Sequence, residues 1–208
     1  KIDGTGNVAA PDGSKSRSNN HGVEIVDAQI GYKGSNASIV IKGEGGKATG
    51  GVPSTKANRS GNSGVKIIGF NELMQVLSNN EIKVTGTGGT YGPDDNDNTG
   101  VELTGGSELG YEGSEASITL NGTGGTVSSA GVQIKGRRNL SFLPSKVTSV
   151  VSDGDITITG NAGSGNADGF KPGIVLKAYS KIGSENSSAN VELNTDDDNR
   201  ATVQDGFD

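Results

Sequence analysis

The feature that most constrains this chain is a repeat whose clearest copy runs from Gly100 to Gly125, GVELTGGSELGYEGSEASITLNGTGG. Near its start, Val101 and Leu103 alternate with polar residues, and near its end Ile118 and Leu120 do the same. An alternation of period two predicts a β-strand with one buried face. The unit therefore contains an opening strand and a closing strand, with room for a third short strand between them.

Further copies of this unit fill the rest of the chain. Each opens on a Gly and an aliphatic β-branched residue and closes on an alternating strand, and the openings lie at Gly22, Gly64, Gly100, Gly131 and Gly173. Length varies mainly after the closing strand, and stacked coils tolerate insertions at corners but not in strands. The sequence therefore predicts one β-solenoid segment over 1–208, with a partial rung over 1–21 and rungs starting near 22, 64, 100, 131 and 173.

Stacking of these rungs predicts four core ladders, all aliphatic and mostly β-branched, as buried parallel strands prefer. The ladders are Val23, Val65, Val101, Val132, Ile174; Ile25, Ile67, Leu103, Ile134, Leu176; Ile39, Ile82, Ile118, Ile156, Val191; and Ile2, Ile41, Val84, Leu120, Ile158, Leu193. We expect an all-β fold, a right-handed parallel β-helix of about five three-strand rungs with variable corner loops. An antiparallel sandwich would explain the alternation but not the regular return of the opening before each closing strand.

Three segments of the repeat need separate interpretation. Asn121–Gly125 is rich in Gly, which reaches positive φ without strain, so we expect a corner there. Asn71–Leu77 has apolar residues at helical spacing and is either a short helix or the second strand of its rung with a bulge. The insertion over Arg137–Gly154 is too apolar for a free loop, so we expect a strand and a flap folded onto the rod, or an exposed apolar patch for a partner.

Composition argues against several classes of function. Hydrophobic content of 30% would suggest disorder in a globular chain, but a solenoid needs only a narrow aliphatic column. The absence of Cys excludes disulfides, thiol catalysis and Cys-based zinc sites. A net charge of −6 without a basic stripe argues against nucleic-acid binding and attraction to anionic membranes. No apolar run approaches the roughly 18 residues of a membrane span, so we expect no direct membrane insertion.

Calcium is the one cofactor that the sequence suggests. Loop 90–99 is acidic, and its second half resembles the start of an oxygen-ligand loop, although Gly106 stands where an EF-hand has its final Glu. The fifth rung replaces the glycine corner by three carboxylates. The candidate Ca²⁺ ligands are Asp94, Asp95 and Asp97 in the first segment, and Asp196, Asp197 and Asp198 in the second.

The chain offers few groups for catalysis, so we expect no enzyme. His21 is the sole histidine, and its place beside a turn predicts a solvated loop residue. Polysaccharide lyases and hydrolases need carboxylates clustered on one strand face. The outward row of the opening strands, which alternates in sign, predicts an ion-pair ladder instead: Glu24, Lys66, Glu102, Gln133 and Val175. One outward row of the closing strands has no regular threonine array, which argues against ice binding: Val40, Lys83, Thr119, Thr157 and Glu192.

The pair GV-x-I and S-I-T-L-x-GTGG, repeated over nearly the whole chain with variable polar loops, resembles the repeat of large bacterial β-strand-repeat surface proteins. Those proteins are similar in style to the filamentous-haemagglutinin exoproteins. The resemblance implies a secreted or cell-surface location and a structural or adhesive role, as an adhesin or in an extracellular filament. The alternative left open is a carbohydrate-binding or carbohydrate-active β-helix, with surface glycans as partners.

The first residues, KIDGTG, match the end of a closing strand. A partial rung exposes unpaired backbone groups and an open aliphatic column, which solitary solenoids normally cover with capping repeats. We therefore expect the segment to continue into further rungs, either within one giant repeat chain or in a neighbouring subunit stacked head to tail. Head-to-tail contacts that do not close produce a filament.

Overall fold

The computed structural model describes residues 1–6, 20–46, 61–90, 98–125, 129–138, 145–164, 172–184, 189–196 and 200–204. Over these ranges the chain forms β-strands joined by turns, with no helix, and every strand pair of its three sheets is parallel. The predicted all-β parallel solenoid is confirmed.

The strands fall into an opening, a middle and a closing sheet, named after their place in each rung. The opening sheet contains β2 (Val23–Val26), β5 (Val65–Ile68), β8 (Val101–Thr104), β11 (Val132–Lys135), β14 (Pro172–Lys177) and β17 (Arg200–Gln204). The middle sheet contains β3 (Gln29–Gly31), β6 (Met74–Leu77), β9 (Ser107–Gly110), β12 (Thr148–Val151) and β15 (Ser180–Ile182). The closing sheet contains β1 (Ile2–Thr5), β4 (Ile39–Glu44), β7 (Glu81–Thr87), β10 (Ser117–Thr123), β13 (Ile156–Asn161) and β16 (Val191–Thr195).

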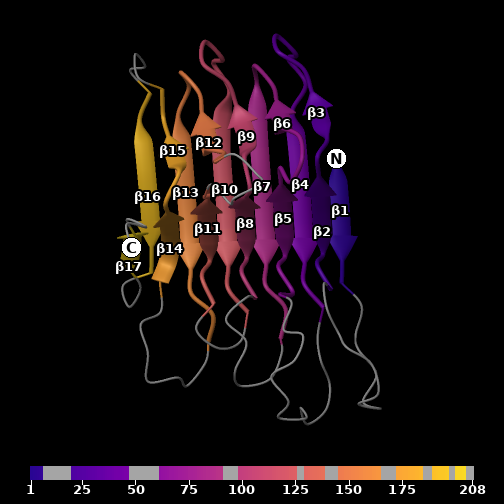
Figure 1. The fold of residues 1–208 in the computed structure, drawn as a ribbon, viewed down its shortest axis with the longest axis vertical. Coiled ribbons are helices and arrows are strands. Elements are labelled where there is room, and N and C mark those ends of the chain that lie inside the picture. Colours follow the sequence, from indigo (N-terminus) through magenta and orange to yellow (C-terminus); the bar gives the residue numbers. More distant parts are fainter. Residues whose placement is uncertain are drawn as a thin grey trace.

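Each rung is a flattened coil. The chain passes through the opening strand and then the middle strand in the same direction, and it returns through the closing strand (Figure 1). The opening and middle sheets lie in one layer and the closing sheet in the other. Successive rungs pair strand to strand along the rod, so the order in every sheet follows the order of the rungs. The aliphatic core occupies the space between the two layers.

All four predicted ladders have the predicted register. Val101 pairs with Val65 and Val132, and Ile118 pairs with Ile82 and Ile156. A fifth ladder, which the sequence analysis missed, runs through the middle sheet: Ile30, Val76, Leu109, Val150 and Ile182. It was missed because the other inward position of the middle strands is often polar, as at Ser107 and Thr148, which leaves one aliphatic residue per strand.

Burial of the core is complete in the central rungs. Ile82, Ile118 and Ile156 have no exposed surface, and each such side chain stabilises the fold by roughly 1.5–3 kcal/mol. Core residues of the first and last closing strands are more open: Ile2 in β1 is 36% exposed and Val191 in β16 is 41% exposed. The aliphatic column is therefore continuous, and its protection increases toward the middle of the described rod.

A seam of glycines closes the cross-section where closing strands end and opening strands begin. The predicted corner at Asn121–Gly125 is wrong in part, because β10 extends to Thr123 and contains Gly122. A Cβ atom on Gly122 would overlap the carbonyl oxygen of Gly131. Glycine is required here because two backbones meet with no side chain between them, and not because the chain turns. The seam consists of Gly4, Gly43, Gly86, Gly122 and Gly160 against Gly22, Gly64, Gly100, Gly131 and Gly173.

Buried serines line the opposite corner, between the middle and closing strands. The hydroxyl of Ser152 lies 2.6 Å from the carbonyl oxygen of Ala116 and accepts the N–H of Gly154 at 3.1 Å. These contacts satisfy backbone groups that the corner would otherwise bury unpaired. The same position, four residues before the first core residue of the closing strand, gives a ladder of Ser35, Ser78, Ser114 and Ser152.

A ladder of asparagines lies beside the glycine seam. The side-chain oxygen of Asn62 accepts the backbone N–H of Asn20 at 3.2 Å, and that of Asn98 accepts the N–H of Asn62 at 3.3 Å. Asn62 and Asn98 are buried, with 4% and 1% of their surface exposed. The side chains of Asn62 and Asn98 thus each link their own rung to the preceding one.

Corner loops of odd-numbered rungs reach over the even rung between them. The Tyr111 hydroxyl of the third rung accepts the Gly34 N–H of the first rung at 2.7 Å, and the Lys33 ammonium lies 5.4 Å from the Tyr111 ring centroid. Lys181 of the fifth rung pairs with Glu112 of the third at 3.1 Å. The second and fourth rungs have shorter loops at this corner.

Even-numbered rungs are joined in the same way at the corner between opening and middle strands. Lys146 of the fourth rung donates to the carbonyl oxygen of Asn71 in the second rung at 2.8 Å, and Arg137 donates to that of Phe70. Both contacts pass over the third rung, whose corner contains Gly105 and Gly106, at φ 72° and 104°. The two corners therefore connect alternate rungs, odd to odd and even to even.

Two further predictions are settled by the strand assignments. The second-rung segment Asn71–Leu77 contains the strand β6 and no helix, so the helical interpretation is wrong. The fourth-rung insertion contains the predicted strand, β12, preceded by an antiparallel bridge between Arg137 and Lys146. The strand β17, which pairs Val203 with Leu176, starts a further rung that the sequence analysis did not predict.

Candidate binding face

The outward face of the closing sheet presents the most regular array of polar side chains in the described part of the chain. Alternation in β7, β10 and β13 sends every second residue outward. Strand pairing aligns these residues in rows that run along the rod. The Asn121 row consists of Asp3, Lys42, Thr85, Asn121, Thr159 and Asn194. The Thr123 row consists of Thr5, Glu44, Thr87, Thr123 and Asn161.

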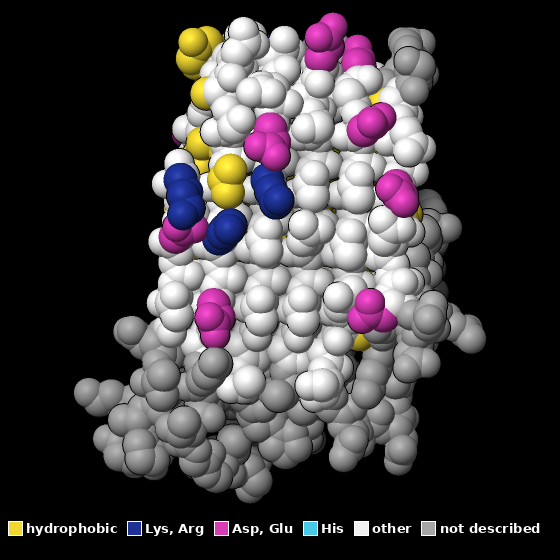
Figure 2. All heavy atoms as spheres, turned by 180° about the vertical axis from the view of Figure 1, so that it is seen from behind, with side chains coloured by type: hydrophobic (Ala, Val, Ile, Leu, Met, Phe, Trp, Pro, Cys, Tyr) yellow, Lys and Arg dark blue, Asp and Glu magenta, His cyan; other side chains and the backbone are white. Residues whose placement is uncertain are grey.

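The Asn121 and Thr123 rows are uncharged where they cross β7, β10 and β13, whereas Lys83 of β7 lies beside Thr119 on this face. Figure 2 looks onto it and shows charged side chains gathered toward the two ends of the sheet, with other polar side chains between them. We call the central group the neutral face; its members are Thr85, Thr87, Thr119, Asn121, Thr123, Thr157, Thr159 and Asn161. All eight are half-buried or exposed, so their hydroxyl and amide groups lie at the surface.

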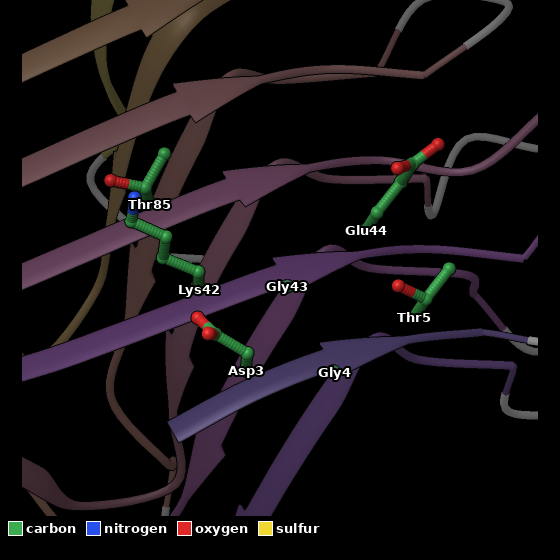
Figure 3. Close-up of a pocket in the computed structure, with 7 residues that line it drawn as sticks. All are labelled: Asp3, Gly4, Thr5, Lys42, Gly43, Glu44 and Thr85. Carbon is green, nitrogen blue, oxygen red and sulfur yellow. The ribbon is translucent and has the colours of Figure 1, made fainter. Parts of the chain in front are cut away.

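An open hollow of about 230 Å³ lies at the N-terminal end of the two rows. It is lined by Asp3, Lys42 and Thr85 on one side and by Thr5 and Glu44 on the other. Figure 3 shows the backbone of Gly4 and Gly43 passing between these side chains. The hollow lies over Gly4 and Gly43, whose Cβ positions point inward to the seam, so only the flanking residues of each strand send side chains outward here.

Charges of both signs surround the hollow. The Lys1 ammonium lies 2.8 Å from the Asp3 carboxylate, whose hydrogen bond and charge raise the pKa of Lys1 above its usual value. Lys42 and Glu44 add one charge of each sign. The hollow can therefore bind polar groups of either character, whereas the neutral face beyond it offers only uncharged donors and acceptors.

The outward row of the opening strands differs from the predicted ion-pair ladder. Lys66 lies 3.9 Å from the Glu24 carboxylate, as predicted, but the Glu102 carboxylate accepts a hydrogen bond from the Ser63 hydroxyl at 3.2 Å. Val175, predicted to face water, is only 5% exposed. This row is thus a mixture of ion pair, hydrogen bond and buried side chain.

The prediction that His21 is a solvated loop residue is wrong. Its side chain is 3% exposed, and its Nδ1 atom accepts the backbone N–H of Ser63 at 3.1 Å. Its Nε2 atom has no hydrogen-bond partner and lies 3.8 Å from a Glu24 carboxylate oxygen. Burial lowers the pKa of His21, and the positive charge of Lys66 lowers it further. The ring thus lies between Glu24 of its own rung and Ser63 of the next, beside the seam residue Gly22.

Five of the six predicted calcium ligands, Asp94, Asp95, Asp97, Asp197 and Asp198, lie outside the described residues. Asp196 follows β16, and its carboxylate accepts a hydrogen bond from the Asn161 amide at 3.2 Å in the amide orientation that satisfies both groups. Within the described ranges, no three His, Asp or Glu residues come together as a metal site would require. The calcium hypothesis for loop 90–99 stays a prediction.

The neutral face escaped the sequence analysis for one reason. The row that was inspected, through Thr119 and Thr157, is interrupted by Val40, Lys83 and Glu192. The two more regular rows lie in the stretch that was interpreted as a corner. The pattern T/N-G-T/N at the ends of β7, β10 and β13 is the sequence feature that identifies them.

Comparison of the chain with protein-family models, curated proteins and solved structures finds no match in any of the three. In the described residues, no helix has the length and apolar character needed to cross a membrane.

Proposed function

We propose that this chain is a structural or adhesive solenoid of the bacterial cell surface or extracellular space, belonging with the large β-strand-repeat exoproteins. The observation that carries the proposal is the unbroken stacking of rungs around one aliphatic column, which leaves long, regular outer faces for contact. Stacked repeats create extended binding surfaces of this kind. In such an architecture the scaffold supplies reach and rigidity, and its outer side chains supply contacts.

The edges of the described rod support self-association. β1 pairs on one side with β4, and β2 and β3 each pair on one side with the second rung. Ile2 of β1, a member of a core ladder at this edge, is 36% exposed. Within the described residues these strands have no partner on their other side, and a free strand edge can pair with a strand of another copy. Stacking head to tail is therefore part of the proposal.

Carbohydrate binding is the second candidate function. The observation that favours it is the hollow beside Asp3, Lys42 and Glu44, since clustered carboxylate, ammonium and hydroxyl groups suit the hydroxyls of a sugar. A carbohydrate-active enzyme is the less favoured form of this alternative. Release of reducing ends from a polysaccharide panel by the purified chain would support the enzyme.

Display of residues 1–208 on a non-adherent bacterium tests the proposal. Cells that display the chain are expected to be retained under flow on surfaces coated with the purified chain or with bacterial polysaccharide. Cells that display the variant Thr104→Val, which changes one side chain of the opening sheet, serve as a control. They are expected to be retained as well as cells that display the wild-type chain. Light scattering on the purified chain measures assembly. Cells that wash away at the rate of undecorated cells, together with a strictly monomeric chain, would overturn the proposal.

A further inference from the structure

We infer that the neutral face binds an extended, neutral polysaccharide chain that lies along the rod, with one end at the hollow beside Lys42. This inference rests on the proposed adhesive function and names the partner of that surface. It rests on the periodicity, rigidity, free hydrogen-bonding capacity and lack of charge of the Asn121 and Thr123 rows where they cross β7, β10 and β13.

The first argument is periodicity. The rows repeat once per rung, at the strand separation of about 4.8 Å. An extended polysaccharide advances by a similar length per sugar ring, so a chain laid along the Asn121 row meets one polar side chain per ring. A chain laid across the rows would not keep this register. The direction of the ligand thus follows from the direction of the rows.

The second argument is preorganisation. Thr is β-branched and restricted about χ1, so its hydroxyl direction is largely fixed before a ligand arrives. The backbones that carry Thr85, Asn121 and Thr159 are paired on both sides within the sheet. Little conformational entropy is lost when such side chains are immobilised by a ligand, which favours binding.

The third argument is hydrogen-bonding capacity. Within the described residues, the side chains of Thr85, Thr119, Asn121, Thr123 and Thr159 make no hydrogen bond to another part of the chain. Each hydroxyl can donate one hydrogen bond and accept others, and each amide offers donors and an acceptor. This mixture matches sugar hydroxyls, which also donate and accept.

Charge decides between neutral and ionic polysaccharides. The neutral face has no charged member, and the whole chain has a net charge of −6, which disfavours polyanions such as uronates. Cationic polymers would find their acidic partners only at the ends of the face. A neutral ligand is the one whose charge matches the centre of the array.

The absence of aromatic side chains from the eight members of the neutral face sets the expected strength of binding. Without ring stacking, each sugar contributes only hydrogen bonds, whose net value is small because water is displaced. Affinity must therefore come from several rings at once. We expect affinity to rise steeply with chain length and to level off when the ligand is as long as the face.

Titration with β-1,4-linked glucose oligomers of two to six rings, followed by NMR or calorimetry, tests this inference. The test variants, Thr85→Val and Thr159→Val, remove one hydroxyl each from the Asn121 row and keep the side-chain shape. Each is expected to lower the affinity for the six-ring oligomer by about three- to tenfold, the value of one hydrogen bond. The control, Thr104→Val, makes the same change on the opening sheet and is expected to leave affinity unchanged.

Three results would overturn the inference. One is failure of every oligomer to bind at millimolar concentration. Another is binding that is equal in wild type and the double variant Thr85→Val/Thr159→Val. The third is inhibition of ice recrystallisation that this double variant loses while oligomers do not bind, which would assign the array to ice. Flow retention separates this inference from the adhesive proposal, because cells retained without oligomer binding contradict only the inference, and binding without retention contradicts only the adhesive role.

Discussion

Two parts of the same cross-section hold the rungs together by opposite means. In the aliphatic column, bulky side chains such as Ile118 fill the space between the layers and are fully buried. In the glycine seam, Gly122 faces Gly131 and the backbones themselves are in contact. The column needs bulky side chains to fill it, whereas the seam has no room for any side chain. The comparison teaches that a repeat can be conserved in shape by two different constraints, and each is tested by a different substitution.

The largest effect is expected in the column. Ile118→Asp places a carboxylate in the aliphatic interior, where an unpaired charge costs several kcal/mol, about as much as a whole domain of this kind has to spare. Loss of cooperative thermal unfolding by circular dichroism checks the prediction. Thr119→Asp is the matched control, because the adjacent residue faces outward, and it should unfold close to the wild-type temperature. Equal losses in the two variants would show that the inside–outside register is wrong.

A single added methyl group should break the seam. Gly122→Ala drives its Cβ into the carbonyl oxygen of Gly131, which only a backbone shift can relieve. We expect a loss of stability of about 3 kcal/mol or more, the upper end of ordinary overpacking. The control is Gly113→Ala, where a Cβ meets no atom within 4 Å and the cost is the φ of 84°, about 1–2 kcal/mol. Urea unfolding measures the loss for both variants. A loss at Gly122 no larger than at Gly113 would show that the seam does not depend on close backbone contact.

The serine ladder gives an intermediate effect at the end of the cross-section opposite the seam. Ser152→Ala leaves the buried corner without its hydroxyl, which contacts the carbonyl oxygens of Ser114 and Ala116. We expect a loss of about 1–3 kcal/mol. Ser149→Ala on the same strand is the control, since its side chain faces outward, and its unfolding free energy should change by less than about 0.5 kcal/mol. If both variants lose a similar free energy of unfolding, the serine ladder does not stabilise the corner.

The smallest effect is a dependence on pH beside the seam. The pKa of His21 is lowered by burial from its ordinary 6.5, so the folded chain binds fewer protons than the unfolded chain between 6.5 and the folded pKa. Stability from the neutral ring is therefore complete above pH 6.5 and declines as the pH falls below it. Urea midpoints at pH 7.5 and 5.5 measure the decline, and His21→Gln should flatten it. A wild-type midpoint that is the same at both values would contradict the burial of the ring.

The sequence was sufficient for the fold wherever side chains alternate. The ladders through Val101 and Ile118 follow from spacing alone, because only one register buries every aliphatic residue. Short middle strands such as β15 carry too few residues to show a period, and they were located only approximately. The strand Arg200–Gln204 was hidden by the acidic residues around it, although Val203 pairs in register with Leu176.

Glycine was the main source of error, and the reason is physical. In a sequence, a Gly that permits a turn and a Gly that permits two backbones to touch look the same. Gly113 is of the first kind, with positive φ, and Gly122 is of the second, inside a strand. Because a corner was predicted at Gly122, the alternation of the outward residues on either side of it went unnoticed. The buried state of His21 could not be predicted either, since it depends on the position of Ser63 in the next rung.

The corner contacts that skip a rung give the rod a parity. Tyr111 of the third rung contacts the first rung, and Lys146 of the fourth rung contacts the second. Odd-numbered and even-numbered rungs therefore carry different corner loops and cannot replace one another. Removing one rung would bring two long loops onto neighbouring levels at one corner and two short loops at the other. Removing or duplicating two rungs together would leave every contact with a partner of the right kind. The module by which such a rod can grow, by gene duplication or by design, is therefore a pair of coils.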